Sequence, residues 1–429
     1  GFTTRLANEN SWTIAFTEQA ILEYKKFMYL AAISDFMVSP SEIIDKVWHQ
    51  HLVFTQSYQA LCSILGKQIQ HIPSNHNKQE FEKFRKAKER TKIYYEKYFD
   101  KQPENIWVFK SMFESLNLKE AKLNLSTFIT VGILTLVCLS APFYYLLQPI
   151  YAQISNPYFI TGFITLTIIT LLILQNYNKL QLNKIVLNFE KTSFIYALHP
   201  FELIYLKTQK LENVINGTIN DLIVKEAIII NKNKSITLAN NYKAQNISEF
   251  QVVAALEELG TTYYPILLRK LKSKPIFGNI PNSLDTFRTY FNKSKKLALI
   301  FITDFSILAL LILLSITRIT TGIIRDKPVI LILIMTIVLI IVTFLFLKRL
   351  TKQISITTIP DLYKNNILPS RSNENNEHWA YFILGTAVLA SAFVSLIEST
   401  YKSINENEGA SSDSDCGSSC SSCGGCGSD

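Results

Sequence analysis

The sequence predicts a mainly α-helical fold with three parts: a soluble helical N-terminal domain, a polytopic α-helical membrane part, and a winged-helix-like α+β domain between spans. Over the 429 residues, long apolar runs alternate with segments rich in Lys, Asn and Glu, which is the pattern of a polytopic membrane protein. Four runs approach or exceed the roughly 20 apolar residues that cross about 30 Å of hydrocarbon as a helix. The hydrophobic content of 48% would also suit a globular protein, so the prediction depends on its uneven distribution.

The predicted spans form two pairs, 126–147 with 157–175 and 297–316 with 329–347. A fifth run, 380–397, is diluted by small and hydroxyl side chains, and we expect it to be a fifth span. The resulting organisation is a soluble domain (1–125), two spans (126–175), a basic domain (176–296), two spans (297–347), a loop (348–379), a fifth span (380–397) and an acidic tail (398–429).

Lys and Arg near the span ends predict the orientation. The loop 148–156 carries no charge, whereas lysines and arginines cluster at the opposite ends of the spans. We therefore expect a multi-pass protein of the bacterial cytoplasmic (inner) membrane, with 1–125 and 176–296 in the cytoplasm and the tail outside. A short loop with Arg318, Arg325 and Lys327 conflicts with this assignment, because it would also lie outside.

The N-terminal region predicts three helices, 16–31, 40–65 and 78–99. The second is announced by Ser39 as an N-cap, Pro40 at the first helical position and Glu42 three residues after the cap. Its apolar residues recur three or four apart as far as Gly66, which predicts one continuous helix. The chain begins with Gly1 rather than Met, which predicts a fragment or a processed form, and no secretory signal is visible.

This region resembles the N-terminal domain of glycine-rich domain-containing proteins, which occur in plants and bacteria. The resemblance covers about a hundred residues and includes the stretch "SPSEIIDKVWHQHLVFTQSYQALC". The positions that carry it are Asp45, Trp48, His49, His51, Tyr58, Cys62, His71 and Pro73. The resemblance implies a soluble domain of this family but no settled activity.

Four side chains here are candidate metal ligands: Asp45, His49, His51 and His71. Together with Cys62, the three histidines suggest a zinc site, because imidazole and thiolate are the ligands that zinc prefers. On a continuous helix His49 and His51 lie about 200° apart, so they cannot share one ion. A set that also includes Cys62 would need the helix to break. Asp45 and His49 lie on one face and can share a ligand or a hydrogen bond. The spacing itself favours a Trp–His–Tyr–Cys core stripe with satisfied polar atoms.

The middle region carries 17 Lys and Arg against 9 Asp and Glu. Two short helices (200–206 and 210–225) and a hairpin around 231–234 follow the order of a winged helix. Two further helices are expected after it, at 246–259 and 264–271. Lys225, Lys232 and Lys234 at its wing could contact phosphate. Tethering between spans favours a protein-interaction module instead, and no Arg-rich or aromatic-interleaved stripe supports nucleic acid as a partner.

The stretches "HPFELIYLK", "VINGTINDLIVKEAIII" and "RDKPVILILI", with the cysteine-containing tail, resemble a bacterial membrane-protein family of unassigned role. In that family, paired spans enclose such a domain and the chain ends in a Gly/Cys tail. The resemblance covers most of 126–429. This chain departs from it in one respect, because its tail is short and rich in serine.

The acidic tail is disordered by composition and contains four further candidate metal ligands, Cys416, Cys420, Cys423 and Cys426. Their spacing is too tight for a zinc ribbon, which needs two separated pairs. Outside the cell such thiols form disulfides, whereas in the cytosol they stay reduced and can bind zinc or another soft metal.

No Ser/His/Asp order, Walker loop, GxGxxG motif or pair of catalytic carboxylates is present. Asp304, eight residues into the third span, is a functional candidate as an intramembrane charge, but no paired basic residue or broken-helix motif supports transport. The sequence therefore predicts a membrane scaffold or interaction protein whose partners are the lipid bilayer and other proteins. A metal-binding or redox-linked membrane protein is the second interpretation, and a membrane-bound enzyme is the third.

Overall fold

The computed structural model describes residues 1–72, 78–122, 125–239, 242–370 and 377–408. These residues form two compact units. The first unit combines Gly1–Ile215 with Lys272–Ile383, and the second combines Asn216–Leu271 with the segment that begins at Leu384. Both units are built mainly from helices, which confirms the mainly α-helical fold class.

The N-terminal part of the first unit is a group of short helices around an apolar core. They are α1 (Phe2–Asn10), α2 (Ile14–Ile33), α3 (Glu42–Val53), α4 (Thr55–Leu65), α5 (Lys78–Tyr98) and α6 (Glu104–Trp107). The predictions of helices at 16–31 and 78–99 are confirmed by α2 and α5. Phe27 and Trp48 meet at 5.5 Å between ring centroids and join α2 to α3. Burial of one large apolar side chain stabilises the folded state by about 1.5–3 kcal/mol.

Glu23 is the polar centre of this core. Its carboxylate is buried and accepts hydrogen bonds from Lys26 Nζ (2.7 Å), the Tyr95 hydroxyl (2.7 Å) and Trp107 Nε1 (2.8 Å). These donors come from α2, α5 and α6, so one carboxylate ties three helices together. A buried carboxylate is tolerated only when it is paired and hydrogen-bonded in this way.

The predicted helix over 40–65 is wrong as one continuous element, because the chain breaks at Phe54. Phe54 has φ −91° and ψ 63°, outside the helical region, and α4 starts at the next residue. The cap also differs from the prediction. Ser41, not Ser39, accepts the hydrogen bond from the backbone N–H of Ile44 (3.2 Å), while the Ser39 N–H donates to Thr91 Oγ1 of α5 (2.9 Å).

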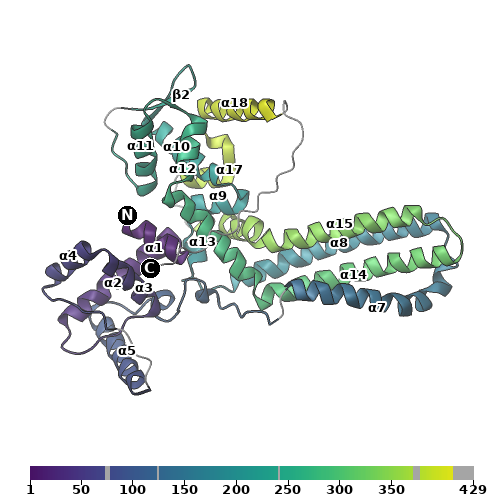
Figure 1. Cartoon of the computed structure of the whole chain (residues 1–429), viewed down its shortest axis with the longest axis horizontal. Coiled ribbons are helices and arrows are strands. Elements are labelled where there is room, and N and C mark those ends of the chain that lie inside the picture. Colours follow the sequence, from purple (N-terminus) through teal and green to yellow (C-terminus); the bar gives the residue numbers. More distant parts are fainter. Residues whose placement is uncertain (73–77, 123–124, 240–241, 371–376, 409–429) are drawn as a thin grey trace, which may run out of the picture. The chain divides into compact units, whose positions relative to one another are not determined.

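Four long apolar helices of the first unit run side by side (Figure 1): α7 (Leu125–Tyr151), α8 (Asn156–Leu187), α14 (Lys295–Ile324) and α15 (Ile330–Gln353). All four are long and apolar enough to cross a membrane, which confirms the four apolar runs. α14 contacts the other three helices and half of its most apolar stretch is buried, whereas the corresponding stretch of α7 is not buried at all. The exposed Leu, Ile and Val side chains suit a hydrocarbon environment.

Arg318 does not lie in the short loop to which the sequence assigned it. It is buried in the last part of α14, where its guanidinium donates hydrogen bonds to the carbonyl oxygens of Tyr151 and Ile154 and to Asn156 Oδ1. The Phe159 ring lies 4.8 Å from the guanidinium carbon. The last carbonyls of α7 have no partner within their helix, so Arg318 caps that helix.

Shorter elements of the first unit connect these parts. They are η1 (Glu114–Leu116), η2 (Phe194–Ala197), α9 (Pro200–Thr208), the start of α10 (Leu211–Val224) and α13 (Pro275–Asn292). α13 packs against α1, where Asn279 Nδ2 donates to the Trp12 carbonyl and Asn282 Nδ2 donates to the Asn8 carbonyl, both at 3.0 Å. The sequence did not predict α13.

The chain after α15 is helical where we predicted a loop over 348–379. It continues through the π-helical turn η3 (Ile354–Thr358), α16 (Ile359–Leu362), the π-helical turn η4 (Tyr363–Ile367) and the 3₁₀ turn η5 (Leu368–Ser370). Tyr363 is fully buried, and its hydroxyl donates to the Ile195 carbonyl and accepts from the Leu198 N–H, both at 2.8 Å. The segment is thus folded against the chain that precedes α9.

The second unit contains an antiparallel sheet of β1 (Ile228–Ile230), β2 (Ser235–Leu238) and β3 (Thr262–Tyr263), in that order, with α11 (Ile247–Leu259) and α12 (Tyr264–Lys272). The predicted hairpin is confirmed. Asn246 caps α11, since its Oδ1 accepts from the Glu249 N–H at 2.8 Å. Lys225, assigned to a phosphate-contacting wing, is paired with buried Glu249 at 2.7 Å. The winged-helix assignment itself stays a prediction.

The predicted fifth span is not one continuous helix. The chain forms α17 (Glu377–Leu384), the 3₁₀ turn η6 (Gly385–Val388) and α18 (Ser391–Glu408), and the two helical parts are bent by 59°. In the first unit, Trp379 stacks on Tyr363 (5.9 Å) and the Tyr381 hydroxyl donates to the Asn213 carbonyl. In the second unit, Phe393 is fully buried and packs edge-on against Tyr264.

Candidate metal site

Helix α3 places Asp45 and His49 on one exposed face. The two residues are four apart, the spacing at which side chains on a helix become neighbours. His49 Nδ1 lies 3.9 Å from Asp45 Oδ2, and 58% of the His49 side chain is exposed. The Ser41 cap fixes the start of this helix one turn earlier. A carboxylate and an imidazole therefore face the same side from a rigid element.

His71 comes from the extended segment that follows α4. Gly66 ends α4 with φ +69°, a left-handed conformation that glycine adopts without strain, and the chain reverses there. Lys67 Nζ then donates to the carbonyl oxygens at the end of α2, including that of Ser34 (3.0 Å). The Tyr58 hydroxyl donates to the Ile69 carbonyl at 2.5 Å. These contacts hold the segment and carry His71 to α3.

His71 completes a cluster of three potential ligands with Asp45 and His49. His71 Nε2 lies 2.9 Å from Asp45 Oδ1, and the two imidazole rings lie 4.4 Å apart. One ligand atom from each residue can be chosen so that all of them lie within 4.8 Å of one another. Trp48 packs edge-on against the His71 imidazole at 4.6 Å between ring centroids and supports one side of it. The His49 side chain remains exposed to solvent.

The cluster has the chemistry of a transition-metal site with an open position. Zinc binds imidazole nitrogen at about 2.0–2.1 Å and carboxylate oxygen at about 2.0–2.2 Å, so ligand atoms around one ion lie roughly 3–4 Å apart. His71 Nε2 lies 2.9 Å and His49 Nδ1 lies 3.9 Å from the nearer Asp45 oxygen. Small side-chain movements bring these atoms to the separations expected around one zinc ion. Two imidazoles and one carboxylate leave a coordination position for water or another ligand.

His51, the remaining candidate in this region, is held apart from the cluster. It is buried, its Nδ1 lies 2.9 Å from the Tyr24 hydroxyl and its Nε2 lies 3.0 Å from Ser57 Oγ. Burial lowers the pKa of His51 below its ordinary value. Tyr24, Trp48, Tyr58 and Cys62 are buried alongside it in the core. The expected core stripe therefore describes His51, while Asp45, His49 and His71 lie outside it.

The tail cysteines Cys416, Cys420, Cys423 and Cys426 lie outside the described residues. The structure therefore brings together three of the eight candidate ligands that the sequence singled out. His71 was a candidate only by residue type, since nothing in its spacing from Asp45 shows that the two meet. The signal for their meeting lies in Gly66, whose left-handed turn sends the chain back toward α3.

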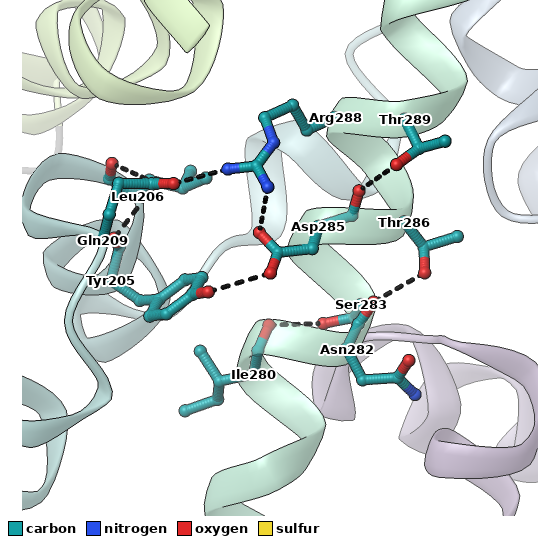
Figure 2. Close-up of polar contacts among 10 residues, drawn as sticks. All are labelled: Tyr205, Leu206, Gln209, Ile280, Asn282, Ser283, Asp285, Thr286, Arg288 and Thr289. Carbon is teal, nitrogen blue, oxygen red and sulfur yellow. Dashed lines mark hydrogen bonds and ion pairs between the residues drawn. The ribbon is translucent and has the colours of Figure 1, made fainter. Parts of the chain in front are cut away.

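A second polar cluster joins α9 to α13 (Figure 2). Asp285 accepts a hydrogen bond from the Tyr205 hydroxyl (3.1 Å) and pairs with Arg288 (3.2 Å), which donates to Gln209 Oε1 (2.6 Å). Burial raises the pKa of the Tyr205 hydroxyl. Sequence reasoning missed this cluster because it did not predict α13, although Pro275 at the start of a helix and Asp285 three residues before Arg288 were available signals.

An open groove of about 550 Å³ runs along the same face of α13. Its lining includes Phe113, Asn282, Asp285, Thr286, Thr289, Tyr290 and Lys293. Phe113 stacks on Tyr290 at 5.4 Å and closes one side. The lining mixes aromatic, hydroxyl and charged groups without a nucleophile–base pair, so the groove has the character of a contact surface.

A third group of titratable residues surrounds the start of α9. His199 caps the helix by accepting from the Phe201 N–H (3.3 Å), and Glu202 accepts from the His199 N–H (2.7 Å). Burial raises the pKa of Glu202 to about 7. Burial, with the nearby His378, lowers the pKa of His199 to about 4. His199 and Glu202 form a helix cap, and their reciprocal hydrogen bonds to the backbone give both side chains a structural role.

Comparison with known proteins identifies no relative: no family model, no curated protein and no solved structure matches this chain. The function must therefore be argued from the site itself.

Proposed function

We propose that this chain is a membrane-anchored metal-binding protein whose N-terminal region holds a divalent transition metal between Asp45, His49 and His71. The observation that carries the proposal is that two imidazoles and a carboxylate converge, with ligand atoms within 4.8 Å of one another. Asp45 and His49 come from α3, and His71 comes from the segment after α4. Ion pairs with Asp45 account for each imidazole taken singly. A bound metal accounts for both together, because the His49 and His71 rings lie 4.4 Å apart beside the same carboxylate.

The open coordination position indicates an exchangeable site. Structural zinc sites are closed by four protein ligands, whereas sites with three keep a position for water or a ligand. His49 and Asp45 are 58% and 37% exposed, so a small molecule or a side chain of a partner can reach the ion. We therefore propose that the site binds metal reversibly and presents it to a ligand. No residue is assigned a catalytic role.

Four apolar helices support the membrane anchor, and we propose that the N-terminal region and 176–296 share the cytoplasmic side. The burial of Arg318 supports this orientation. That charge conflicted with the orientation as long as it was treated as a free loop residue. Because it caps α7, it has a structural reason to lie at the opposite end of the bundle.

The experiment that tests the metal site uses the full-length protein with the four tail cysteines replaced by serine, so that thiolates cannot hold the ion. The protein is stripped with a chelator, loaded with Zn²⁺, desalted and measured by elemental analysis. We expect about one zinc per chain, since three ligands serve one ion. His71→Gln, His49→Gln and Asp45→Asn should each lose it, while His199→Gln should keep it. Equal zinc in all variants would contradict the proposal.

A scaffold or interaction role, the first interpretation from the sequence, is the second candidate. The groove along α13 supports it, because the groove is open, mixed in character and backed by the Tyr205–Asp285–Arg288 cluster (Figure 2). The resemblances to glycine-rich domain-containing proteins and to the membrane-protein family with a Gly/Cys tail fit either role. Reversing the charge of groove residue Lys293 should abolish partner capture if this role holds, with no effect on zinc content.

A further inference from the structure

Asp304 and Asn178 form an isolated polar pair within the helix bundle. Asp304 lies on α14 and is completely buried, and Asn178 lies on α8 and is 1% exposed. Asn178 Nδ2 donates a hydrogen bond of 2.6 Å to Asp304 Oδ2. The pair joins two helices that we propose to span the membrane.

The pair lacks a donor. Asp304 Oδ1 and Asn178 Oδ1 are both buried, and neither has a hydrogen-bond partner among the described residues. An ionised carboxylate would thus be buried with a single amide donor and one bare oxygen. Such an arrangement is costly, because a buried charge needs a partner of opposite sign or several donors.

No cation compensates Asp304 within the part of the chain that the structure describes. The basic residues on the elements packed around it are Lys179 and Lys184 on α8, Lys295, Lys296 and Arg318 on α14, and Lys348, Arg349 and Lys352 on α15. None of them forms an ion pair with Asp304. Lys295 and Lys296 begin the same helix, roughly 12–14 Å away along its axis at 1.5 Å per residue.

The ligand that fits two unpartnered buried oxygens on hydrogen-bonded side chains is a proton. A bound metal cation takes about six oxygen ligands, and the pair offers two. A single proton on Asp304 removes the charge and supplies the missing donor. Asp304 then donates through Oδ1 to Asn178 Oδ1 while it accepts from Nδ2, so that both residues are satisfied.

We infer that Asp304 binds a proton at neutral pH and forms a reciprocal acid–amide pair with Asn178, which ties α8 to α14. The pair is then neutral, as the interior of a membrane bundle requires. Loss of the proton would leave the two helices joined through one amide donor to a buried carboxylate. The bundle therefore contains a proton-binding site, distinct from the metal site of the N-terminal region.

Infrared spectroscopy of the full-length protein in lipid vesicles tests this inference. A protonated carboxylic acid has a carbonyl stretching band that ionised carboxylates lack. The measurement is made at about pH 7, and labelling aspartate alone separates its band from that of Glu202, whose pKa is about 7. We expect a protonated-acid band that shifts when the protein carries ¹³C-labelled aspartate. The band should disappear in Asp304→Asn and persist in Asp326→Asn, which changes an exposed residue of the loop after α14.

Asp304→Asn should fold, because an amide–amide pair keeps two reciprocal hydrogen bonds and no charge. If it does not fold, the isotope shift in the wild type still identifies a protonated aspartate, and Asp304→Glu should move the band instead of removing it. Absence of any protonated-aspartate band in the wild type would overturn the inference, as would a band that persists unchanged in a folded Asp304→Asn protein.

Discussion

The hydroxyl of Tyr58 donates a 2.5 Å hydrogen bond to the carbonyl oxygen of Ile69, across the turn that ends α4. The same hydroxyl accepts a hydrogen bond from Trp48 Nε1 at 3.1 Å. Trp48 belongs to α3 and lies against His71. One buried oxygen thus fixes the segment that carries His71 relative to the helix that carries Asp45 and His49.

Tyr58→Phe should weaken metal binding although every ligand is retained. The substitution leaves the Ile69 carbonyl and the Trp48 N–H without their partner, which costs about 1–3 kcal/mol for each buried group left unsatisfied. Groups that position metal ligands typically change affinity 10–100-fold. A zinc titration of the tail-serine protein should show a loss in this range.

Tyr29→Phe is the matched control for this titration. Tyr29 lies on α2, is exposed, and has no hydrogen bond among the described residues. Its loss of a hydroxyl should leave zinc affinity unchanged. If Tyr58→Phe binds zinc as tightly as Tyr29→Phe does, the segment does not need this hydrogen bond to present His71.

Glu202→Gln should make stability less dependent on pH. Burial raises the pKa of Glu202 from 4.5 to about 7, so the folded protein binds a proton more tightly than the unfolded chain does. Its stabilising effect is complete below pH 4.5, declines as pH rises, and is lost above about pH 7. The free-energy change across this window is about 3 kcal/mol. Glutamine serves equally well at this cap position and does not titrate.

The measurement is thermal unfolding of the wild type and Glu202→Gln in the same detergent between pH 4.5 and 8. His199 acts in the opposite direction, because its pKa is lowered to about 4 and its contribution is lost as pH falls below 6.5. Because both proteins contain His199, its contribution cancels when the stability of the variant is subtracted from that of the wild type. The wild type should gain stability relative to the variant as pH falls, and a constant difference would refute the assigned shift.

The two ends of the chain should lie on the same side of the membrane. Four spans are an even number, and the large side chains of 377–400 are used in folded cores: Trp379 against Tyr363 in the first unit, and Phe393 against Tyr264 in the second. Reporter fusions at Gly1 and after Glu408 should therefore report the same compartment. Opposite compartments would show that α17 and α18 together form a bent fifth span.

Composition was sufficient to predict the four long helices, because a continuous apolar run of about 20 residues is typical of a helix long enough to cross a membrane. At 380–397 it predicted one continuous span, whereas the chain forms two helices bent by 59°, with Phe382 and Phe393 buried. Hydropathy alone does not show whether such a run is straight or bent. It also missed the helical segment 354–370, whose buried Tyr363 makes its contacts with Ile195 and Leu198, far away in the sequence.

At the metal site, local spacing and tertiary structure contributed differently. Asp45 and His49 could be paired from sequence, since four residues on a helix bring side chains together. The separation of His49 from His51 also followed from helical geometry, although the helix ends sooner than expected. His71 could not be added, because its approach depends on the left-handed turn at Gly66 and on the Tyr58–Ile69 hydrogen bond.

X-ray absorption at the zinc edge, on full-length protein with its natural tail and one equivalent of Zn²⁺, tests the central claim most directly. Zinc–nitrogen and zinc–oxygen distances are about 2.0–2.2 Å, whereas zinc–sulfur distances are about 2.3 Å. We predict a first shell of nitrogen and oxygen only, with the outer scattering of two imidazoles from His49 and His71. A first shell dominated by sulfur would place the metal on the tail cysteines and contradict the proposed site.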